Sequence, residues 1–170
     1  SGSDIVWAGY ESGQIIKIEN GGENWSLVAG FGDSLPDTIV TDIEISPHDP
    51  QTVMVTFGGY LPDRVWRTNN AGDTWSPVSG SGSGTLPEVQ MNCVTYHPVD
   101  PAWLYLGSDV GLFASDDGGQ TWNVTPRYHS NEGPVYTEVS DLIWHSGDVM
   151  VAVTHGRGMY QCRPLLEVWV

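Results

Sequence analysis

Three segments of the chain repeat one pattern without gaps, and this internal repeat constrains the fold more than any other feature of the sequence. They span residues 18–25, 68–75 and 115–122, and each has Gly at its fifth position and Trp at its eighth. The three tryptophans lie 50 and 47 residues apart. A repeat of this period is typical of folds that assemble similar supersecondary units side by side. The chain is therefore expected to contain a series of related units.

Each repeated segment has the chemistry of a hairpin turn. Its third residue is Asn or Asp, whose short side chain can accept hydrogen bonds from nearby backbone N–H groups. Its Gly can adopt positive φ without strain, and its Trp is expected to pack beneath the turn as a small local core. We call these segments the repeat turns. The residues assigned here to folding, not to catalysis, are Asn20, Gly22, Trp25, Asn70, Gly72, Trp75, Ser115, Asp117, Gly119, Thr121 and Trp122.

Short strands are predicted around these turns. Residues 40–50 align with residues 91–101 as an alternating strand followed by a Pro-Asp turn. The chain has 21 Gly and 11 Pro but only 16% charged residues, which favours tight turns and short strands over surface helices. Each unit is expected to have four strands. First strands begin at Val40, Met91 and Val139; second strands are Asp4–Gly9, Val53–Phe57, Trp103–Gly107 and Val149–Thr154; third strands are Gln14–Glu19, Arg64–Thr68, Gly111–Ser115 and Gly158–Cys162; fourth strands are Asn24–Val28, Thr74–Val78 and Thr121–Val124.

Residues 115–122 resemble the Asp-box motif, S-x-D-x-G-x-T-W, at every specified position, and residues 68–75 keep its Gly, Thr and Trp. The chain is thus similar to the Asp-box, or BNR-repeat, β-propeller superfamily, which includes sialidases, xyloglucan-degrading glycoside hydrolases, sortilin-type receptors and a photosystem II assembly factor. This resemblance implies an all-β propeller in which each unit is a blade and the Asp-box joins the third and fourth strands. One domain, 1–170, would hold two complete and two partial blades at residues 4–30, 38–79, 89–125 and 138–170.

Residues 154–158, Thr-His-Gly-Arg-Gly, look like an element found in the last blade of secreted bacterial members. The resemblance implies the C-terminal end of a propeller and a secreted or cell-surface location. Residues 165–170 are expected to form a degenerate fourth strand or a closing strand. Propellers close with about 4–8 blades, so the chain is a four-bladed ring, a fragment or a half-ring. Open strand edges invite pairing, and we expect a homodimer or a strand-closed ring.

The charge balance and the cysteines exclude some classes of partner and crosslink. A net charge of −15 repels nucleic acid and anionic membranes, and no apolar run approaches the roughly 20 residues that span a bilayer. We therefore expect neither a nucleic-acid partner nor membrane insertion. Cys93 and Cys162 fall on different strand types of different blades, so they are predicted to be free thiols.

Candidate ligand-binding residues lie on the face opposite the repeat turns, where the loops joining second to third strands gather. We call this the loop face, and loops are where function is expected on such scaffolds. The predicted ligand-binding residues are Tyr10, Tyr60, Asp109, His155 and Arg157. Further candidates on this face are Glu11, Asp63, Arg64, Tyr128 and His129. Hydrogen bonding within the hairpins is the structural alternative for His155 and Arg157.

A second constellation consists of carboxylates near the central channel. Asp42, Cys93 and Asp141 occupy the same position in successive first strands. Asp42 and Asp141, with Asp109, could act as the general acid and base of an inverting glycoside hydrolase. The alternative is that they cap strand ends. Sialidase activity is rejected, because the chain has only five arginines and the negative field repels an anionic sugar.

The function that the sequence favours is a non-catalytic, secreted binding module for a neutral carbohydrate or a protein. The alternatives are a fragment or subunit of a glycoside hydrolase acting on neutral polysaccharide, and a structural fragment with no activity of its own. No nucleotide-binding loop or zinc pattern is present in the sequence, and its five histidines are scattered. We expect no cofactor and no metal site.

Overall fold

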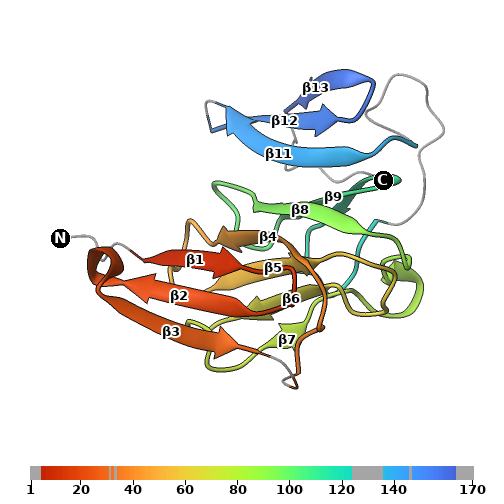
Figure 1. Ribbon diagram of the computed structural model, residues 1–170. Coiled ribbons are helices and arrows are strands. Elements are labelled where there is room, and N and C mark those ends of the chain that lie inside the picture. Colours follow the sequence, from red (N-terminus) through yellow and green to blue (C-terminus); the bar gives the residue numbers. More distant parts are fainter. Residues whose placement is uncertain (1–4, 31, 33, 124–135, 146, 164–170) are drawn as a thin grey trace.

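A computed structural model describes residues 5–30, 32, 34–123, 136–145 and 147–163. Strands and two 3-10 turns make up the regular structure of this part of the chain, and the strands form four antiparallel sheets. The sheets follow one another in chain order, with the first and the last at opposite ends of the molecule (Figure 1). The chain is all-β, as predicted, and we refer to the sheets as blades 1 to 4.

The strand bounds follow the predicted ones closely. Blade 1 contains β1 (Val6–Gly9), β2 (Ile15–Glu19) and β3 (Asn24–Ala29). Blade 2 contains β4 (Val40–Ile45), β5 (Val53–Phe57), β6 (Val65–Thr68) and β7 (Ser76–Pro77). Blade 3 contains β8 (Met91–Tyr96), β9 (Leu104–Ser108) and β10 (Gly111–Ser115). Blade 4 contains β11 (Val139–His145), β12 (Val149–Thr154) and β13 (Gly158–Cys162). The 3-10 turns are η1 (Asn20–Gly22) and η2 (Gly82–Gly84).

The prediction of a fourth strand in blade 3, at Thr121–Val124, is wrong for the residues that the structure describes. Residues 121–123 form no strand, and the backbone link to β10 is a single bond from the Asn123 N–H to the Ala114 carbonyl, at 2.8 Å. Blade 2 is therefore the one four-stranded sheet among the described residues. The predicted strand at 165–170 lies outside them.

The same irregularity recurs in the first strand of blades 2, 3 and 4. The pairing register shifts between Val40 and Asp42, between Met91 and Cys93, and between Val139 and Asp141. The residue skipped in each shift is polar, and in two blades its side chain reaches the next blade. The Thr41 hydroxyl donates to the Met91 carbonyl at 2.7 Å, and the Asn92 amide donates to the Val139 carbonyl at 3.2 Å. The irregularity thus joins consecutive blades.

Apolar side chains fill the space between consecutive blades. Strand β5 shows the principle, because all five of its residues are buried. Val53 and Val55 belong to the cluster shared with blade 1, whereas Met54 belongs to the cluster shared with blade 3. We call the side of a blade that contacts the preceding blade its leading face, and the opposite side its trailing face. A third cluster joins blade 3 to blade 4, with Tyr105 from β9 and Met150 from β12.

The second and third repeat turns form as their sequence predicts, whereas in the first turn Asn20 itself has a φ of 54° and begins η1. In the third turn the Asp117 carboxylate accepts the Thr121 N–H at 2.9 Å and the Thr121 hydroxyl at 2.6 Å. In the second turn the Asn70 side-chain oxygen accepts the Thr74 N–H at 2.9 Å. The fifth residue of each turn has the positive φ for which Gly is suited, with values of 102° at Gly22, 97° at Gly72 and 86° at Gly119.

The three turn tryptophans differ in burial, and this corrects the prediction of a local core beneath each turn. Trp122 is only 3% exposed, and its Nε1–H donates to the Val78 carbonyl of blade 2 at 2.8 Å. Trp75 is half-buried and meets Trp7 of blade 1 edge to face. Trp25 is 63% exposed. The cover for each Trp therefore comes from the preceding blade, and no described blade precedes Trp25.

Candidate functional site

The hairpins that join β1 to β2, β5 to β6, β9 to β10 and β12 to β13 lie at the ends of the blades opposite the repeat turns. Antiparallel strands impose this, because consecutive hairpins of a meander alternate between the two ends. The predicted ligand-binding residues lie in these four hairpins: Tyr10 in the first, Tyr60 in the second, Asp109 in the third, and His155 and Arg157 in the fourth.

Two tyrosines present their rings to solvent on neighbouring hairpins of the loop face. Tyr60 is 70% exposed, and Tyr10 is also exposed. The backbone beneath them is hydrogen-bonded, in the first hairpin to blade 2 and in the second to the residue that precedes β4 of its own blade. The Val40 N–H donates to the Tyr10 carbonyl at 3.1 Å, and the Gly58 N–H donates to the Ile39 carbonyl at 2.9 Å. These hairpins therefore hold exposed aromatic surface on an anchored backbone.

The polar candidates of the loop face contact residues of their own blades. Asp109 accepts a hydrogen bond from the Asn92 amide at 3.2 Å. The His155 Nδ1 lies 3.9 Å from a Glu138 carboxylate oxygen, and its backbone N–H donates to the Glu138 carbonyl at 3.0 Å. Arg157 is exposed on the same hairpin. In the described part of the chain, these hydrogen bonds and this ion pair of Asp109 and His155 do not join the two side chains to each other. Tyr128 and His129 lie outside the described residues.

Arg64 is not available to a ligand, contrary to the prediction. Its side chain is 1% exposed, and its guanidinium donates to the carbonyls of Leu61 and Pro87. Burial lowers its pKa, opposed by the nearby carboxylates of Glu88 and Asp63. Arg64 therefore clamps its own hairpin to the segment that enters blade 3.

The predicted carboxylate pair is engaged in structural hydrogen bonds. One Asp42 oxygen accepts the Ile43 N–H at 2.8 Å, and the other accepts the Val94 N–H of blade 3 at 2.9 Å. Burial raises the Asp42 pKa, and these two bonds oppose that shift. Asp141 makes the first of the two bonds, to the Leu142 N–H at 2.8 Å. Asp42 thus has a structural role, as the alternative held, but the role is to link two blades and not to cap a strand end.

Glu44 is a carboxylate that the sequence analysis missed. Burial, and then the charge of Asp42, raise its pKa to about 7. One of its oxygens accepts the Thr95 hydroxyl at 3.2 Å, and that hydroxyl in turn accepts the Trp144 Nε1–H at 3.2 Å. The chain of bonds crosses blades 2, 3 and 4. The sequence could have indicated Glu44, because residues two apart on a strand share a face and Glu44 lies two residues after Asp42.

We expect Glu44 to make stability depend on pH. Its pKa is 4.5 in an unfolded chain and about 7 in the fold. A carboxyl with a raised pKa favours folding below 4.5, and this contribution is lost as pH rises through 7. Glu44→Gln should therefore increase the free energy of unfolding at pH 8 by about 1–2 kcal/mol, allowing for partial exposure, and change it little at pH 4.5. Urea titrations at both pH values test this, with exposed Glu23→Gln as control.

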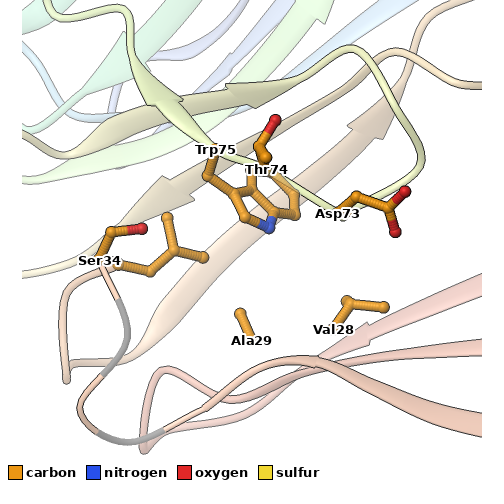
Figure 2. A pocket seen from close by; sticks show the side chains of 8 residues that line it. Val28, Ala29, Ser34, Asp73, Thr74 and Trp75 are labelled. Atoms are coloured by element: carbon orange, nitrogen blue, oxygen red, sulfur yellow. The ribbon is translucent and has the colours of Figure 1, made fainter.

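A pocket of about 410 Å³ opens between blades 1 and 2, near the second repeat turn and away from the loop face. Figure 2 shows the Trp75 ring above Ala29 and Val28, with Ser34 and Asp73 at its sides. Between blades 2 and 3 the corresponding space is occupied by residues 80–86, where the Gly84 carbonyl accepts the Trp122 N–H at 2.9 Å. The pocket reflects a difference in the loops between blades, which the sequence did not predict.

Other kinds of site were sought within the described residues. No group of three or more His, Cys, Asp or Glu side chains there could hold a metal ion. Cys93 is buried on β8 and Cys162 is exposed on β13, and both are free. Burial raises the pKa of the Cys93 thiol to about 12, so it is not a reactive thiolate at neutral pH. In the described part of the chain, no helix has the length and apolarity to cross a membrane.

No protein-family model and no curated protein matches the chain. Solved structures do resemble it. A GH74 xyloglucanase from Xanthomonas campestris superimposes with a TM-score of 0.68 at 15% identity, over 95% of this chain and 28% of the xyloglucanase. YCF48 bound to D1 peptide gives a TM-score of 0.63 at 14% identity, over 94% of this chain and 48% of the YCF48 chain. The fold is that of a β-propeller. The described blades build part of one.

A third similar structure is the extracellular domain of a putative hybrid two component system from B. thetaiotaomicron. It gives a TM-score of 0.67 at 11% identity, over 93% of this chain and 19% of that one. The chain therefore spans less than half the length of each of these three propeller proteins. At such low identities the likeness shows the fold, whereas activity and ligands have to be argued from the residues of this chain.

Proposed function

We propose that this chain is a non-catalytic propeller module that binds a neutral carbohydrate through its loop face, and that its repeat turns are Asp-boxes. The exposure of Tyr10 and Tyr60 on adjacent anchored hairpins supports this proposal most directly. Aromatic rings are the usual platforms for the apolar faces of sugars, and hydrogen-bonding side chains around them fix orientation. His155 and Asp109 supply such groups on neighbouring hairpins.

The charge of the chain supports a neutral ligand over an anionic one. Six basic residues stand against 21 acidic ones, giving a net charge of −15. Such a field raises the local concentration of cations and lowers that of anions. A neutral oligosaccharide bound by stacking and hydrogen bonds avoids this cost. A secreted or cell-surface location agrees with such a ligand, and one similar structure is an extracellular domain.

The glycoside hydrolase alternative is weaker because two of its candidate carboxylates, Asp42 and Asp109, accept hydrogen bonds from groups of the chain itself. An inverting hydrolase needs one carboxyl that donates a proton and another that activates water. Both oxygens of Asp42 instead accept backbone N–H groups, and Asp109 accepts the Asn92 amide. A protein ligand on the loop face is the second candidate, favoured by the similar fold of YCF48, whose structure contains a bound peptide.

Calorimetric titration with a panel of neutral oligosaccharides, including β-linked glucans and xyloglucan fragments, tests the proposed function. We expect binding to wild type, and a loss of at least tenfold in affinity, about 1.4 kcal/mol, for Tyr60→Ala/His155→Ala, since the variant lacks both an exposed ring and a hydrogen-bonding side chain. Tyr60→Phe keeps the ring and serves as the matched control, so its affinity should stay close to wild type.

Release of reducing sugar is assayed in the same samples. Binding without release supports the module. Turnover that disappears in Asp141→Asn would favour the hydrolase instead. If no oligosaccharide in the panel binds, the carbohydrate proposal fails and a protein ligand becomes the better account.

A further inference from the structure

The leading face of blade 1 is apolar, and no blade within the described part of the chain covers it. The pairing registers place Val6, Ile18 and Trp25 in one row across the three strands, and Ala8, Ile16 and Leu27 in the next row. All six side chains therefore point to the same side of the sheet. Val6 is exposed, Trp25 is 63% exposed and Leu27 is 61% exposed. Contiguous apolar surface of this kind marks an interaction site on soluble proteins.

The equivalent positions of the other blades are buried against a neighbour. Val53 and Leu104 begin their second strands as Val6 does in blade 1, and each pairs with the last residue of its third strand. Met150, the second residue of β12, pairs with the last residue of β13 in the same way, and all three are at most 1% exposed. Trp122, the counterpart of Trp25, is covered by blade 2. The uncovered face of blade 1 is thus one half of an interface that the chain forms three times internally.

The repeat turns show where a preceding blade would sit. A Cβ placed on Gly72 would lie 3.0 Å from the Val28 Cβ of blade 1, and one on Gly119 would lie 3.2 Å from the Val78 Cβ of blade 2. A Cβ placed on Gly22 would meet nothing within 4 Å. The second and third turns therefore press against the preceding blade, while Gly22, which also has positive φ, has no described neighbour at that distance.

The other half of this interface lies on blade 4, where none of the described blades covers it. On the trailing faces of blades 1 and 2, Ile15 and Val65 are fully buried. Met159 is their counterpart in blade 4, because it lies three residues before Cys162, which pairs with Met150. In the same way Ile15 and Val65 lie three residues before the partners of Val6 and Val53. Met159 is 73% exposed, and Ile143 is exposed on the same face. One chain therefore carries both complementary halves at its two ends (Figure 1).

We propose that the leading face of blade 1 binds the trailing face of blade 4 of a second copy of this chain. Such a contact is head-to-tail, and two copies joined by two of these contacts close into a symmetric ring. The interface has the chemistry of the internal blade junctions, with apolar side chains from both sheets. The chain also spans 48% of the YCF48 propeller, so two copies match the length of one such chain. This surface is distinct from the loop face.

Light scattering and sedimentation equilibrium test the proposal. Wild type should have the mass of two 18.5 kDa chains, and Leu27→Glu should have the mass of one. Leu27 is exposed, so its replacement leaves the fold of each chain intact, which circular dichroism checks. Val99→Glu is the matched control, because Val99 is 71% exposed on a turn outside both faces, and it should remain a dimer. Association should strengthen with salt, because each copy carries a charge of −15.

A mixing experiment tests the head-to-tail geometry. Met159→Glu disables the other half of the contact, so it should also be monomeric alone. An equimolar mixture of Leu27→Glu and Met159→Glu retains one unaltered contact between unlike copies and should form dimers. A monomeric wild type at the highest soluble concentration would overturn the proposal, and so would dimers that survive both substitutions or a mixture that stays monomeric.

Discussion

Replacing Trp122 with alanine is expected to lower the free energy of unfolding by about 3–5 kcal/mol, the range for a large aromatic side chain removed from a core. Trp122 is 3% exposed, packs in the cluster between blades 2 and 3, and donates to the Val78 carbonyl at 2.8 Å. Its loss opens a cavity and leaves that carbonyl without its indole donor. Urea unfolding, measured in the Leu27→Glu background to keep copies apart, gives the value.

Trp25→Ala in the same background is the matched control. Trp25 occupies the same position in the first repeat turn but is 63% exposed, so its loss should cost less than about 1 kcal/mol, as for most surface substitutions. Equal losses at the two positions would show that burial of the turn tryptophans does not depend on a preceding blade, which contradicts the account of blade packing given above.

The second large effect is expected at Arg64. Arg64→Met retains much of the side-chain volume but removes the donors that reach the carbonyls of Leu61 and Pro87. Hydrogen bonds to charged groups contribute about 1.5–3 kcal/mol each, and buried carbonyls left unpaired add to the loss. We therefore expect a decrease of about 3 kcal/mol or more in the free energy of unfolding.

Arg163→Met is the matched control for Arg64. Arg163 is exposed and lies 3.5 Å from an Asp148 carboxylate oxygen. Exposed ion pairs of this kind contribute about 0–1 kcal/mol. If Arg64→Met proved as mild as Arg163→Met, the Arg64 guanidinium would be solvated, and the earlier prediction of a ligand-binding role would regain support.

The sequence predicted the strands and turns well because their determinants are local. Period-two alternation identified β4 and β8, and the turn chemistry of Asn70 and Asp117 identified two of the hairpins between third and fourth strands. The exposure of Trp25 could not be predicted in this way. A turn of the same sequence pattern is buried or exposed according to whether another blade lies against it, which is a property of the assembly.

The site was less predictable than the fold for the same reason. Asp42 was a candidate for acid–base chemistry. One of its oxygens, however, accepts a hydrogen bond from the N–H of Val94, a residue 52 positions later in the chain. Arg64 was predicted to lie on the loop face because of its place in the sequence. Its guanidinium instead donates to the Pro87 carbonyl, which belongs to the segment that enters another blade. Which polar groups are satisfied is decided by long-range packing, and a single sequence reports mainly the local part of it.

A crystal structure of the chain is the most direct measurement of the central claim, that consecutive blades pack leading face on trailing face and that the two end faces are completed by a second copy. The account predicts Trp122 against Val78 within each chain, and Trp25 and Leu27 buried against Met159 and Ile143 of a second copy. A ring closed within one chain, with Trp25 against blade 4 of the same copy, would contradict it.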